Sequence, residues 1–177
     1  DSDHTLAIAP NLLQQNFTCS VPDRVWLADL TYVPTDEGWL YVAAMKDLCT
    51  RKIVGWAMRD DMQAQIAVDA LAMAVMRQQP LPALIVHSDR GGQYASEAFR
   101  DALAAIGAVQ SMSGKGNAYD NAPMESFFSS LKGERLDHEH YRTRDEARGA
   151  VFAYIETFYN TVRMHSGIGY RSPNRFE

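Results

Sequence analysis

Three acidic residues carry the chemistry that this sequence suggests. Asp29 interrupts an apolar run over residues 25–33, and Asp89 directly follows another over residues 83–88. A carboxylate among strand-forming residues is costly to bury unless a positive charge neutralises it. Glu125 lies 36 positions after Asp89 (125 − 89 = 36) in a helix-forming segment. Two strand-borne aspartates and a helix-borne glutamate suit a divalent-metal site for phosphoryl transfer on a nucleic acid.

Such a site would hold two Mg²⁺ ions about 3.5–4 Å apart, one activating the nucleophile and one stabilising the leaving oxygen. Mg²⁺ prefers oxygen ligands and keeps several waters, so three carboxylates suffice when phosphate oxygens complete the shell. The alternative for any one of these acids is an ordinary surface position. The residues that flank them decide between the two interpretations.

Lys132 follows Glu125 by seven positions, or nearly two helical turns. It is therefore expected on the same helix face, about 10.5 Å further along. An ammonium group there would hold the next phosphate while Glu125 acts at the scissile one. Taken alone, Lys132 would be a solvated helix lysine, so its functional interpretation depends on the three acids.

Length and composition indicate one ordinary globular domain. The 177 residues are 46% hydrophobic and 22% charged, enough for a sizeable core. No apolar stretch reaches the ~18 residues of a membrane span, and no signal peptide is visible, so a cytoplasmic protein is expected. Cys19 and Cys49 lack a metal-ligand spacing and are expected to be ordinary thiols in a reducing compartment.

The charge distribution argues mildly against tight DNA binding by this chain alone. The net charge is −5, and the first 89 residues account for it with 6 Lys/Arg and 11 Asp/Glu (6 − 11 = −5). DNA-binding proteins usually present a basic face. If the chain acts on DNA, affinity and site choice are expected to come largely from elsewhere in the full protein.

Apolar patterning predicts an α/β domain that follows an irregular arm over residues 1–22. Three strands joined by tight turns predict an antiparallel meander at residues 24–34, 39–48 and 53–59. Short strands are expected at 84–87 and 109–112, a polar loop at 113–121, and an irregular tail at 163–177. Helical periodicity or capping signals mark residues 64–78, 96–106, 122–136 and 144–161.

This order of elements predicts a mixed five-stranded sheet flanked by helices, as in the ribonuclease-H-like fold. In that architecture the first strand lies in the middle of the sheet beside the fourth. Asp29 and Asp89 would then lie on neighbouring strands, and a later helix would bring Glu125 alongside. The domain is expected to span residues 23–177.

The segments around the acids form a specific combination of motifs. Residues 26–32 are WLADLTY, residues 87–94 are HSDRGGQY, and residues 111–122 are SMSGKGNAYDNA. The sequences MESFF and LK follow at 124–128 and 131–132. The end of the chain contains FYN at 158–160, then Arg163, HS at 165–166, GY at 169–170 and SP at 172–173.

At these motifs, and over about residues 15–177, the chain resembles the catalytic core of bacterial insertion-sequence transposases. These are the DDE-type enzymes of the IS-three group, related to retroviral integrases. The resemblance implies a ribonuclease-H-like fold, a D,D(35)E site with two Mg²⁺ or Mn²⁺ ions, and DNA cleavage and strand transfer without a covalent protein–DNA intermediate. By position, Asp29 matches the first acid, which bridges both metals, Asp89 the second and Glu125 the third. Lys132 matches the basic residue one heptad after the glutamate.

The resemblance also implies partners. These are the terminal ends of a mobile element, target DNA and further copies of the same chain. Members of the family carry helix-turn-helix DNA-binding segments ahead of this core, and nothing before residue 23 fits one. Recognition of terminal repeats is therefore expected to lie outside this chain.

Other residues are weaker candidates for contacts with DNA. The Gly-flanked loop before the catalytic helix offers Lys115, Asn117, Tyr119 and Asn121, and such a loop could close on DNA. Ordinary turn chemistry also selects Asn and Gly, so both interpretations stay open.

The remaining candidates lie after Asp89 and in the tail. Arg163 and His165, with Arg171, form either a basic DNA-contacting tail or a structural lid over the sheet. Gln93 and Tyr94 either contact DNA or only shape the turn after Asp89. His87 is expected to be a core histidine and not a ligand.

Three other functions fit parts of the sequence. A stand-alone ribonuclease-H-type nuclease would cut strands without joining them. A catalytically dead DNA-binding or oligomerisation module is disfavoured by the intact acid triad. A glycosidase would use two carboxylates without a metal, so metal dependence would exclude it.

Overall fold

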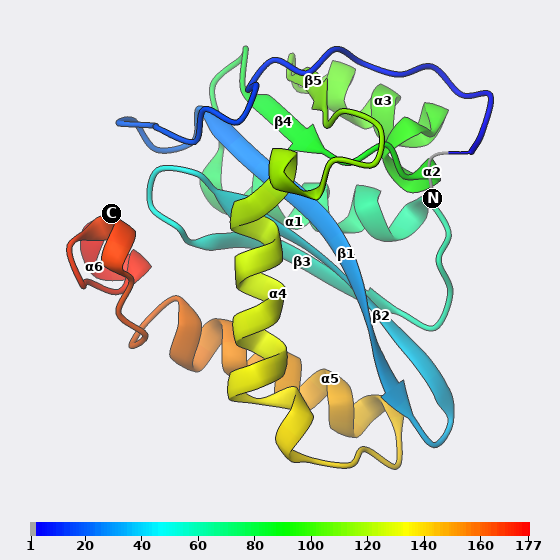
Figure 1. Cartoon of the computed structure of the whole chain (residues 1–177), viewed down its shortest axis with the longest axis vertical. Helices are drawn as coiled ribbons and strands as arrows, with labels where there is room; N and C mark the ends of the chain where they lie inside the picture. The colour runs from blue at the N-terminus through cyan, green and yellow to red at the C-terminus, as the bar shows by residue number, and fades with distance from the viewer. Residues whose placement is uncertain (1–2) are drawn as a thin grey trace.

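The protein is a five-stranded sheet with helices on both faces (Figure 1). The computed structural model describes residues 3–177. The sheet order is β3-β2-β1-β4-β5, which places the first strand beside the fourth and confirms the predicted ribonuclease-H-like arrangement. The strands are β1 (Val25–Thr35), β2 (Gly38–Asp47), β3 (Ile53–Arg59), β4 (Ile85–Ser88) and β5 (Val109–Met112).

The sheet combines an antiparallel meander with two parallel strands. β1, β2 and β3 pair antiparallel, whereas β4 pairs parallel to β1 and to β5. Parallel neighbours need crossover connections, and helices supply them here. The crossovers are α1 (Gln65–Gln78), between β3 and β4, and the pair α2 (Gly92–Ala95) and α3 (Glu97–Ala105), between β4 and β5.

Each face of the sheet has its own core, because side chains alternate along a strand. Trp26 and Ala28 pack on the face covered by α1 and α3, while Leu27 and Val33 pack on the opposite face. α4 (Ala122–Glu134) and α5 (Arg144–Ala153) cover that second face. Gly55 lets α1 lie close to β3, since a Cβ there would come within 2.3 Å of a carbonyl oxygen of α1.

α4 lies across the sheet in front of β1 (Figure 1). Pro123 is accommodated in its first turn, where no intrahelical partner is needed for the missing N–H. The helix buries Met124, Phe127, Phe128 and Leu131. Its other sides, which carry Glu125 and Lys132, remain accessible.

The final long helix is not uniform, so the prediction of one continuous helix over 144–161 is wrong. α5 ends at Ala153, and a π-helical segment, η3 (Tyr154–Tyr159), continues it. The wider turn of a π segment shifts the residues that follow it. Tyr159 packs on Phe127 with ring centroids 4.9 Å apart. The Asn160 amide bonds both the N–H and the carbonyl of Ile53, at 2.9 and 3.0 Å.

The tail and the arm are more ordered than the sequence suggested. The tail contains η4 (Ser166–Ile168) and α6 (Pro173–Phe176), elements too short for a periodic signal. The predicted helix over 122–136 instead ends at Glu134 and is followed by η2 (Leu136–His138). The arm packs along β5, where Pro10 accepts a hydrogen bond from the Met112 N–H at 3.2 Å. Within residues 3–177, no helix combines the length and apolarity of a membrane span.

Candidate functional site

The sheet register brings the two aspartates together. Leu27 of β1 pairs with His87 of β4 in parallel, so Asp29 and Asp89 follow two residues later at the same edge. Glu125 projects from the first turn of α4. All three acids line one cavity of about 400 Å³. We name this cavity the acid groove.

Each acid is held differently. Asp29 is buried at 9% exposure, and its Oδ1 accepts a hydrogen bond from the Leu30 N–H at 2.8 Å. Asp89 is half-buried just beyond β4, and its Oδ1 accepts from the Gly91 N–H at 2.8 Å. A Cβ at Gly91 would lie 2.9 Å from that oxygen, so the glycine leaves room for the carboxylate. Glu125 is exposed.

The electrostatics of the acid groove favour a cation. Burial raises the pKa of Asp29 to about 7, and the negative charges of Asp89 and Glu125 add to the shift. Desolvation and like charges both disfavour the ionised form of a carboxyl group. A divalent ion placed among the three carboxylates would offset this repulsion.

The donor set fits a hard divalent metal, although the side chains are not yet arranged around one. Within the described residues, no three acidic, histidine or cysteine side chains are positioned to hold an ion as they stand. The acid groove nevertheless offers three carboxylates as oxygen ligands, which suit Mg²⁺ or Mn²⁺, and Arg90 is the one cationic side chain that the described part of the chain places in its lining. Its lining also includes Asn121, whose buried Oδ1 has no hydrogen-bond partner in residues 3–177. Metal binding would require the three carboxylates to turn toward one another, and Asp89 could use Oδ2 for this because only its Oδ1 accepts from the Gly91 N–H.

The loop before α4 is organised by Asp120, a residue that the sequence did not single out. Its carboxylate accepts hydrogen bonds from the Gly114 N–H at 2.6 Å and from Asn117 at 3.1 Å. Asn11 and Gln15 of the arm donate to the same carboxylate at 3.2 and 2.9 Å. The arm therefore fixes this loop. The link between the arm and the loop could not be predicted from sequence, because Asn11 and Gln15 lie more than 100 positions from Asp120.

The predicted loop candidates have different environments. Tyr119 is 77% exposed and Lys115 is also exposed, whereas Asn117 is half-buried. Asn121 is buried, and its amide nitrogen donates to the Ala28 carbonyl at 3.1 Å. Asn121 therefore ties the start of α4 to β1 next to Asp29.

The residues around Asp89 are mainly structural. His87 is fully buried and bonds the Ser111 hydroxyl and the Asp120 carbonyl, both at 2.8 Å, which confirms a core histidine. Tyr94 is 1% exposed, so the turn-shaping alternative holds for it and direct DNA contact does not. Gln93 donates to the Met62 carbonyl at 2.8 Å.

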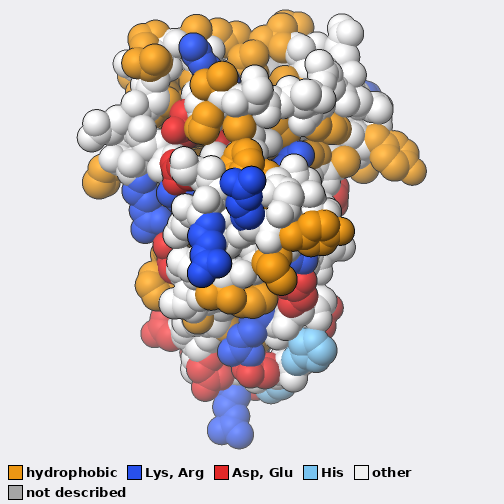
Figure 2. All heavy atoms as spheres, turned by 90° about the vertical axis from the view of Figure 1, so that its left-hand side faces the viewer, with side chains coloured by type: hydrophobic (Ala, Val, Ile, Leu, Met, Phe, Trp, Pro, Cys, Tyr) orange, Lys and Arg blue, Asp and Glu red, His pale blue; other side chains and the backbone are white. Residues whose placement is uncertain are grey.

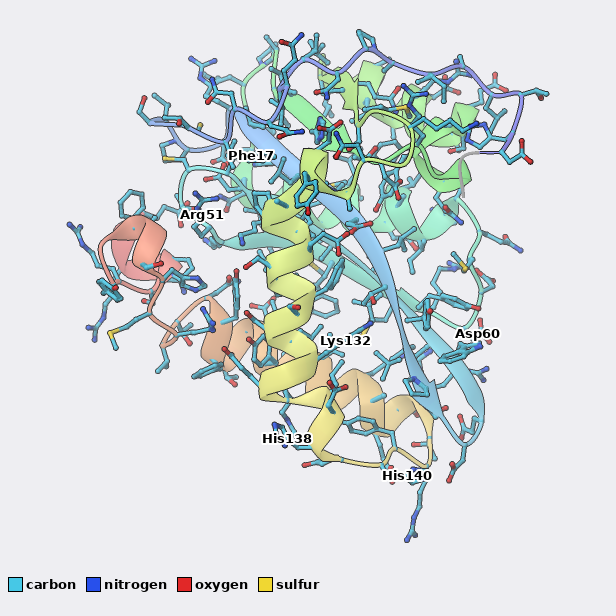
Figure 3. The ribbon with its side chains drawn as sticks, in the orientation of Figure 1. Phe17, Arg51, Asp60, Lys132, His138 and His140 are labelled. Atoms are coloured by element: carbon cyan, nitrogen blue, oxygen red, sulfur yellow. The ribbon has the colours of Figure 1, made fainter. Side chains whose placement is uncertain are left out.

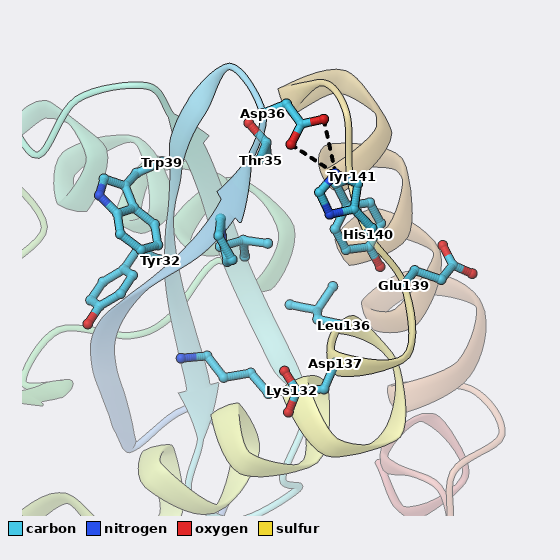
Figure 4. A pocket seen from close by; sticks show the side chains of 12 residues that line it. Tyr32, Thr35, Asp36, Trp39, Lys132, Leu136, Asp137, Glu139, His140 and Tyr141 are labelled. Atoms are coloured by element: carbon cyan, nitrogen blue, oxygen red, sulfur yellow. Dashed lines mark hydrogen bonds and ion pairs between the residues drawn. The ribbon is translucent and has the colours of Figure 1, made fainter.

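The acid groove continues toward Lys132. A second cavity of about 460 Å³ is lined by Asp29, Glu125 and Lys132, so the lysine shares the groove with two of the acids. Its Nζ lies 5.4 Å from the centroid of the Tyr32 ring. Figures 3 and 4 show Lys132 extending from α4 toward the strands.

An apolar cavity of about 470 Å³ lies beyond Lys132, at the far end of β1 (Figure 4). Tyr32 and Trp39, both about half exposed, meet edge to face at its rim with ring centroids 4.8 Å apart. None of the three groove acids lines it. The candidate chemistry therefore belongs to the acid groove and not to this larger space.

Contacts within the protein dominate around the tail candidates. Arg163 pairs with Glu134 at 2.6 Å, and His165 is 9% exposed with its ring 4.5 Å from that of Tyr159. Burial lowers the pKa of His165 to about 4, so its ring is neutral near pH 7. Arg171 is exposed, with its guanidinium 5.7 Å from the Phe176 ring centroid. These contacts favour a structural lid, and DNA contact by the tail stays a prediction.

The sheet order and the flanking helices define a ribonuclease-H-like domain. Solved structures with this fold superpose on the chain although their sequences differ. The catalytic core of bovine immunodeficiency virus integrase gives a TM-score of 0.63 at 16% identity, covering 86% of this chain and 92% of that one. The HTLV-2 integrase catalytic core, solved with magnesium, gives 0.63 at 14% identity, covering 88% and 97%. A simian T-cell lymphotropic virus intasome chain gives 0.72 at 12%, covering 99% and 60%.

Sequence comparison identifies the family. Two models described as integrase core domain match residues 20–118 and residues 107–173. The chain belongs to the integrase core domain family.

Several relatives are much closer in sequence. The transposase of insertion element IS904 from Lactococcus lactis is 51% identical over 95% of this chain and 66% of its own length. The transposase InsF of IS3A from Escherichia coli is 48% identical, covering 98% of this chain and 60% of its own length. The chain thus spans about 60–66% of the length of the relatives that it matches.

Proposed function

We propose that this chain is the catalytic domain of an insertion-element transposase that cuts DNA and transfers the cut strand. The observation that carries the proposal is the acid groove, in which Asp29, Asp89 and Glu125 line one cavity at the edge of β1 and β4. The 51% and 48% identities to transposases of IS904 and IS3A support the same activity. The core would comprise residues 23–177, with residues 1–22 as an arm.

The three carboxylates would hold two Mg²⁺ or Mn²⁺ ions, which when bound supply nucleophile activation and charge stabilisation in phosphoryl transfer. The magnesium in the HTLV-2 integrase core supports this choice of metal. Asp29 is fixed on the rigid central strand, and Glu125 reaches from the start of α4. Lys132, further along the same groove, would hold a neighbouring phosphate by its charge.

DNA is the proposed partner, as both element ends and target. Lys115 and Tyr119, which are exposed, and the half-buried Asn117 would contact it from the loop beside the acids. Asn121, which is buried, would act at this site by holding the start of α4 against β1. The name of the simian viral neighbour describes an intasome, which supports assembly of several copies around DNA. Helix-turn-helix segments outside this chain would recognise the terminal repeats.

A strand-joining assay tests the proposal and separates it from the nuclease alternative. The full-length protein would be given a labelled pre-cut element end and a supercoiled target plasmid, with Mg²⁺ or with EDTA. We expect metal-dependent joined products from wild type and none from Glu125→Gln. Metal-dependent cutting without joined products would support a stand-alone nuclease instead. Activity that persists in EDTA would contradict both.

A further inference from the structure

A separate polar cavity of about 440 Å³, distinct from the acid groove and its continuation toward Lys132, lies on another side of α4. We name it the basic pocket. It opens between α4, the turn after β2 and the C-terminal segment, and Figure 3 shows Arg51 in that region near α6. Figure 2 shows Lys and Arg side chains gathered over the middle of this face. Its polar lining consists of three lysine or arginine side chains, one neutral histidine and three serine hydroxyls: Lys46, Arg51, Arg163, His165, Ser126, Ser130 and Ser166.

Lys46 is the unusual member of the basic pocket. It is 5% exposed in the middle of the sheet, and its Nζ donates to the Pro123 carbonyl at 3.2 Å. No carboxylate pairs with it among residues 3–177. Burial, together with the positive charges of Arg51 and Arg163, lowers the pKa of Lys46 to about 7. A buried lysine is normally paired, so this unpaired amine, which faces a cavity, would carry its full positive charge only with an anion beside it.

Of the two arginines beside Lys46, only Arg163 has a carboxylate partner among residues 3–177. Arg51 forms no ion pair within the described residues, and its guanidinium lies about 3.5 Å from the position of a Cβ on Gly167. Arg163 is the exception, because Glu134 pairs with it at 2.6 Å. Lys46, Arg51 and Arg163 thus share a single carboxylate, that of Glu134, among the described residues. The cavity between them has room for an anion.

The geometry of α4 separates the two cavities. Successive residues are about 100° apart around a helix. Glu125, Ser129 and Lys132 therefore share one side, which lines the continuation of the acid groove. Pro123, Ser126 and Ser130 share another, which lines the basic pocket. The same helix thus presents carboxylate chemistry on one side and cationic chemistry on the other.

We propose that the basic pocket binds a backbone phosphate of the nucleic acid, at a contact separate from the acid groove. The inference rests on the proposed function, because a DNA substrate is what supplies the phosphate. Guanidinium, ammonium and hydroxyl donors converging on one cavity match the several oxygens of a phosphodiester better than a single carboxylate. In a chain of net charge −5, such a pocket would anchor DNA that the acidic remainder repels.

The test compares Arg51→Gln with Lys52→Gln by fluorescence anisotropy on a labelled random-sequence DNA duplex in EDTA. Both variants remove one positive charge from the same turn. Lys52 does not line the pocket, and it already pairs with Glu177 at 2.8 Å. We expect Arg51→Gln to weaken binding roughly three- to tenfold and to reduce the slope of log affinity against log salt by about 0.9. Lys52→Gln should stay within about twofold of wild type.

Lys46→Met tests the buried cation with a side chain of similar shape. It should lower DNA affinity as Arg51→Gln does, and circular dichroism verifies that it folds. If it does not fold, Arg51→Gln alone decides. DNA binding is measured in EDTA, so a loss of strand transfer does not change the binding result. The proposed strand-transfer activity and the proposed phosphate contact can therefore fail separately.

Three outcomes would overturn the proposal that the basic pocket binds a backbone phosphate. Equal salt slopes for Arg51→Gln, Lys52→Gln and wild type would exclude a specific phosphate contact. A thermal shift with inorganic phosphate that Arg51→Gln abolishes, without any change in DNA binding, would indicate a small-anion site. Loss of self-association by Arg51→Gln in sedimentation, again with unchanged DNA binding, would assign the pocket to a carboxylate of a second copy.

Discussion

The two sides of α4 carry side chains of opposite charge. In the acid groove, two aspartates sit at the edge of neighbouring strands and a glutamate faces them from the helix. In the basic pocket, a lysine is buried within the sheet and arginines reach it from the turn after β2 and from the tail. Carboxylates predominate on the first side, and lysine and arginine side chains predominate on the second. The hydrophobic core on this face of the sheet holds α4 in place between the acid groove and the basic pocket.

The comparison teaches which part of each site is rigid. Asp29 and Lys46 both lie on central strands and are nearly inaccessible. Glu125 and Arg51 are more accessible and approach from a helix end and a turn. Each side therefore has one fixed, desolvated charge and further charges that are able to move toward a ligand. The predictions below alter one side, the helix between them, or one charge at a time.

The largest expected effect is the loss of chemistry on the acid side. Asp89→Asn and Glu125→Gln keep side-chain shape but remove charge, so strand transfer should fall below detection while the fold stays intact. Asp145→Asn is the matched control, because Asp145 is exposed and pairs only with Arg148 at 2.6 Å. Strand transfer by Asp89→Asn at more than a few per cent of wild type would remove this acid from the site.

Damage to α4 itself should affect both sides together. Phe127 is 1% exposed and packs against Phe128 and Tyr159. Phe127→Ala should lower the free energy of unfolding by about 3–5 kcal/mol, measured by urea titration. Phe152, which is 48% exposed, provides the control, and its replacement by Ala should cost clearly less. Similar losses for the two variants would mean that α4 is not anchored as described.

Removing the buried acid should stabilise the metal-free protein in a pH-dependent way. The folded pKa of Asp29, about 7, lies above its ordinary value of 3.8. The folded state therefore binds this proton more tightly, and stability falls as pH rises from about 4 to about 7. In EDTA above pH 7, Asp29→Asn should be more stable than wild type by up to about 4 kcal/mol, since each pKa unit corresponds to roughly 1.4 kcal/mol.

Thermal unfolding at pH 8 and at pH 4 measures this difference, which should shrink at the lower pH. Asp145→Asn serves as the control and should show no comparable pH dependence. A destabilised Asp29→Asn at pH 8 would mean that the ionised carboxylate is stabilised by something other than a metal.

The smallest effect concerns Lys132 on the acid side. Lys132→Ala should weaken DNA binding several-fold and reduce the salt slope by about one counterion, because one phosphate contact is lost. Anisotropy titrations in Ca²⁺ would measure this without cleavage. An unchanged salt slope would make Lys132 an ordinary helix lysine beside Tyr32.

Much of the acid side could be predicted from sequence because its signals are local. Alternating strands, tight turns and the switch to helical periodicity predict the order of the elements, and the fit of that order to the ribonuclease-H-like architecture predicts the sheet order. Asp29 and Asp89 stand out against apolar neighbours. The helix face shared by Glu125 and Lys132 followed from their spacing. These features depend on residues close together in the chain.

The basic side could not be predicted in the same way. Lys46 belongs to the largely apolar strand β2, and nothing nearby in sequence marks its side chain as facing a cavity. Arg51 follows five positions later in the turn after β2, but Arg163 is brought to Lys46 only by the fold. Asp120 and the π-helical segment were missed for the same reason, since distant hydrogen bonds and packing determine them.

The most direct test of the central claim is an anomalous-difference map from crystals of the chain soaked in Mn²⁺. The account predicts a peak in the acid groove within coordination distance of Asp29 and Asp89, with Glu125 turned toward it. No peak in this groove at full Mn²⁺ loading, or a peak bound by other residues, would contradict it.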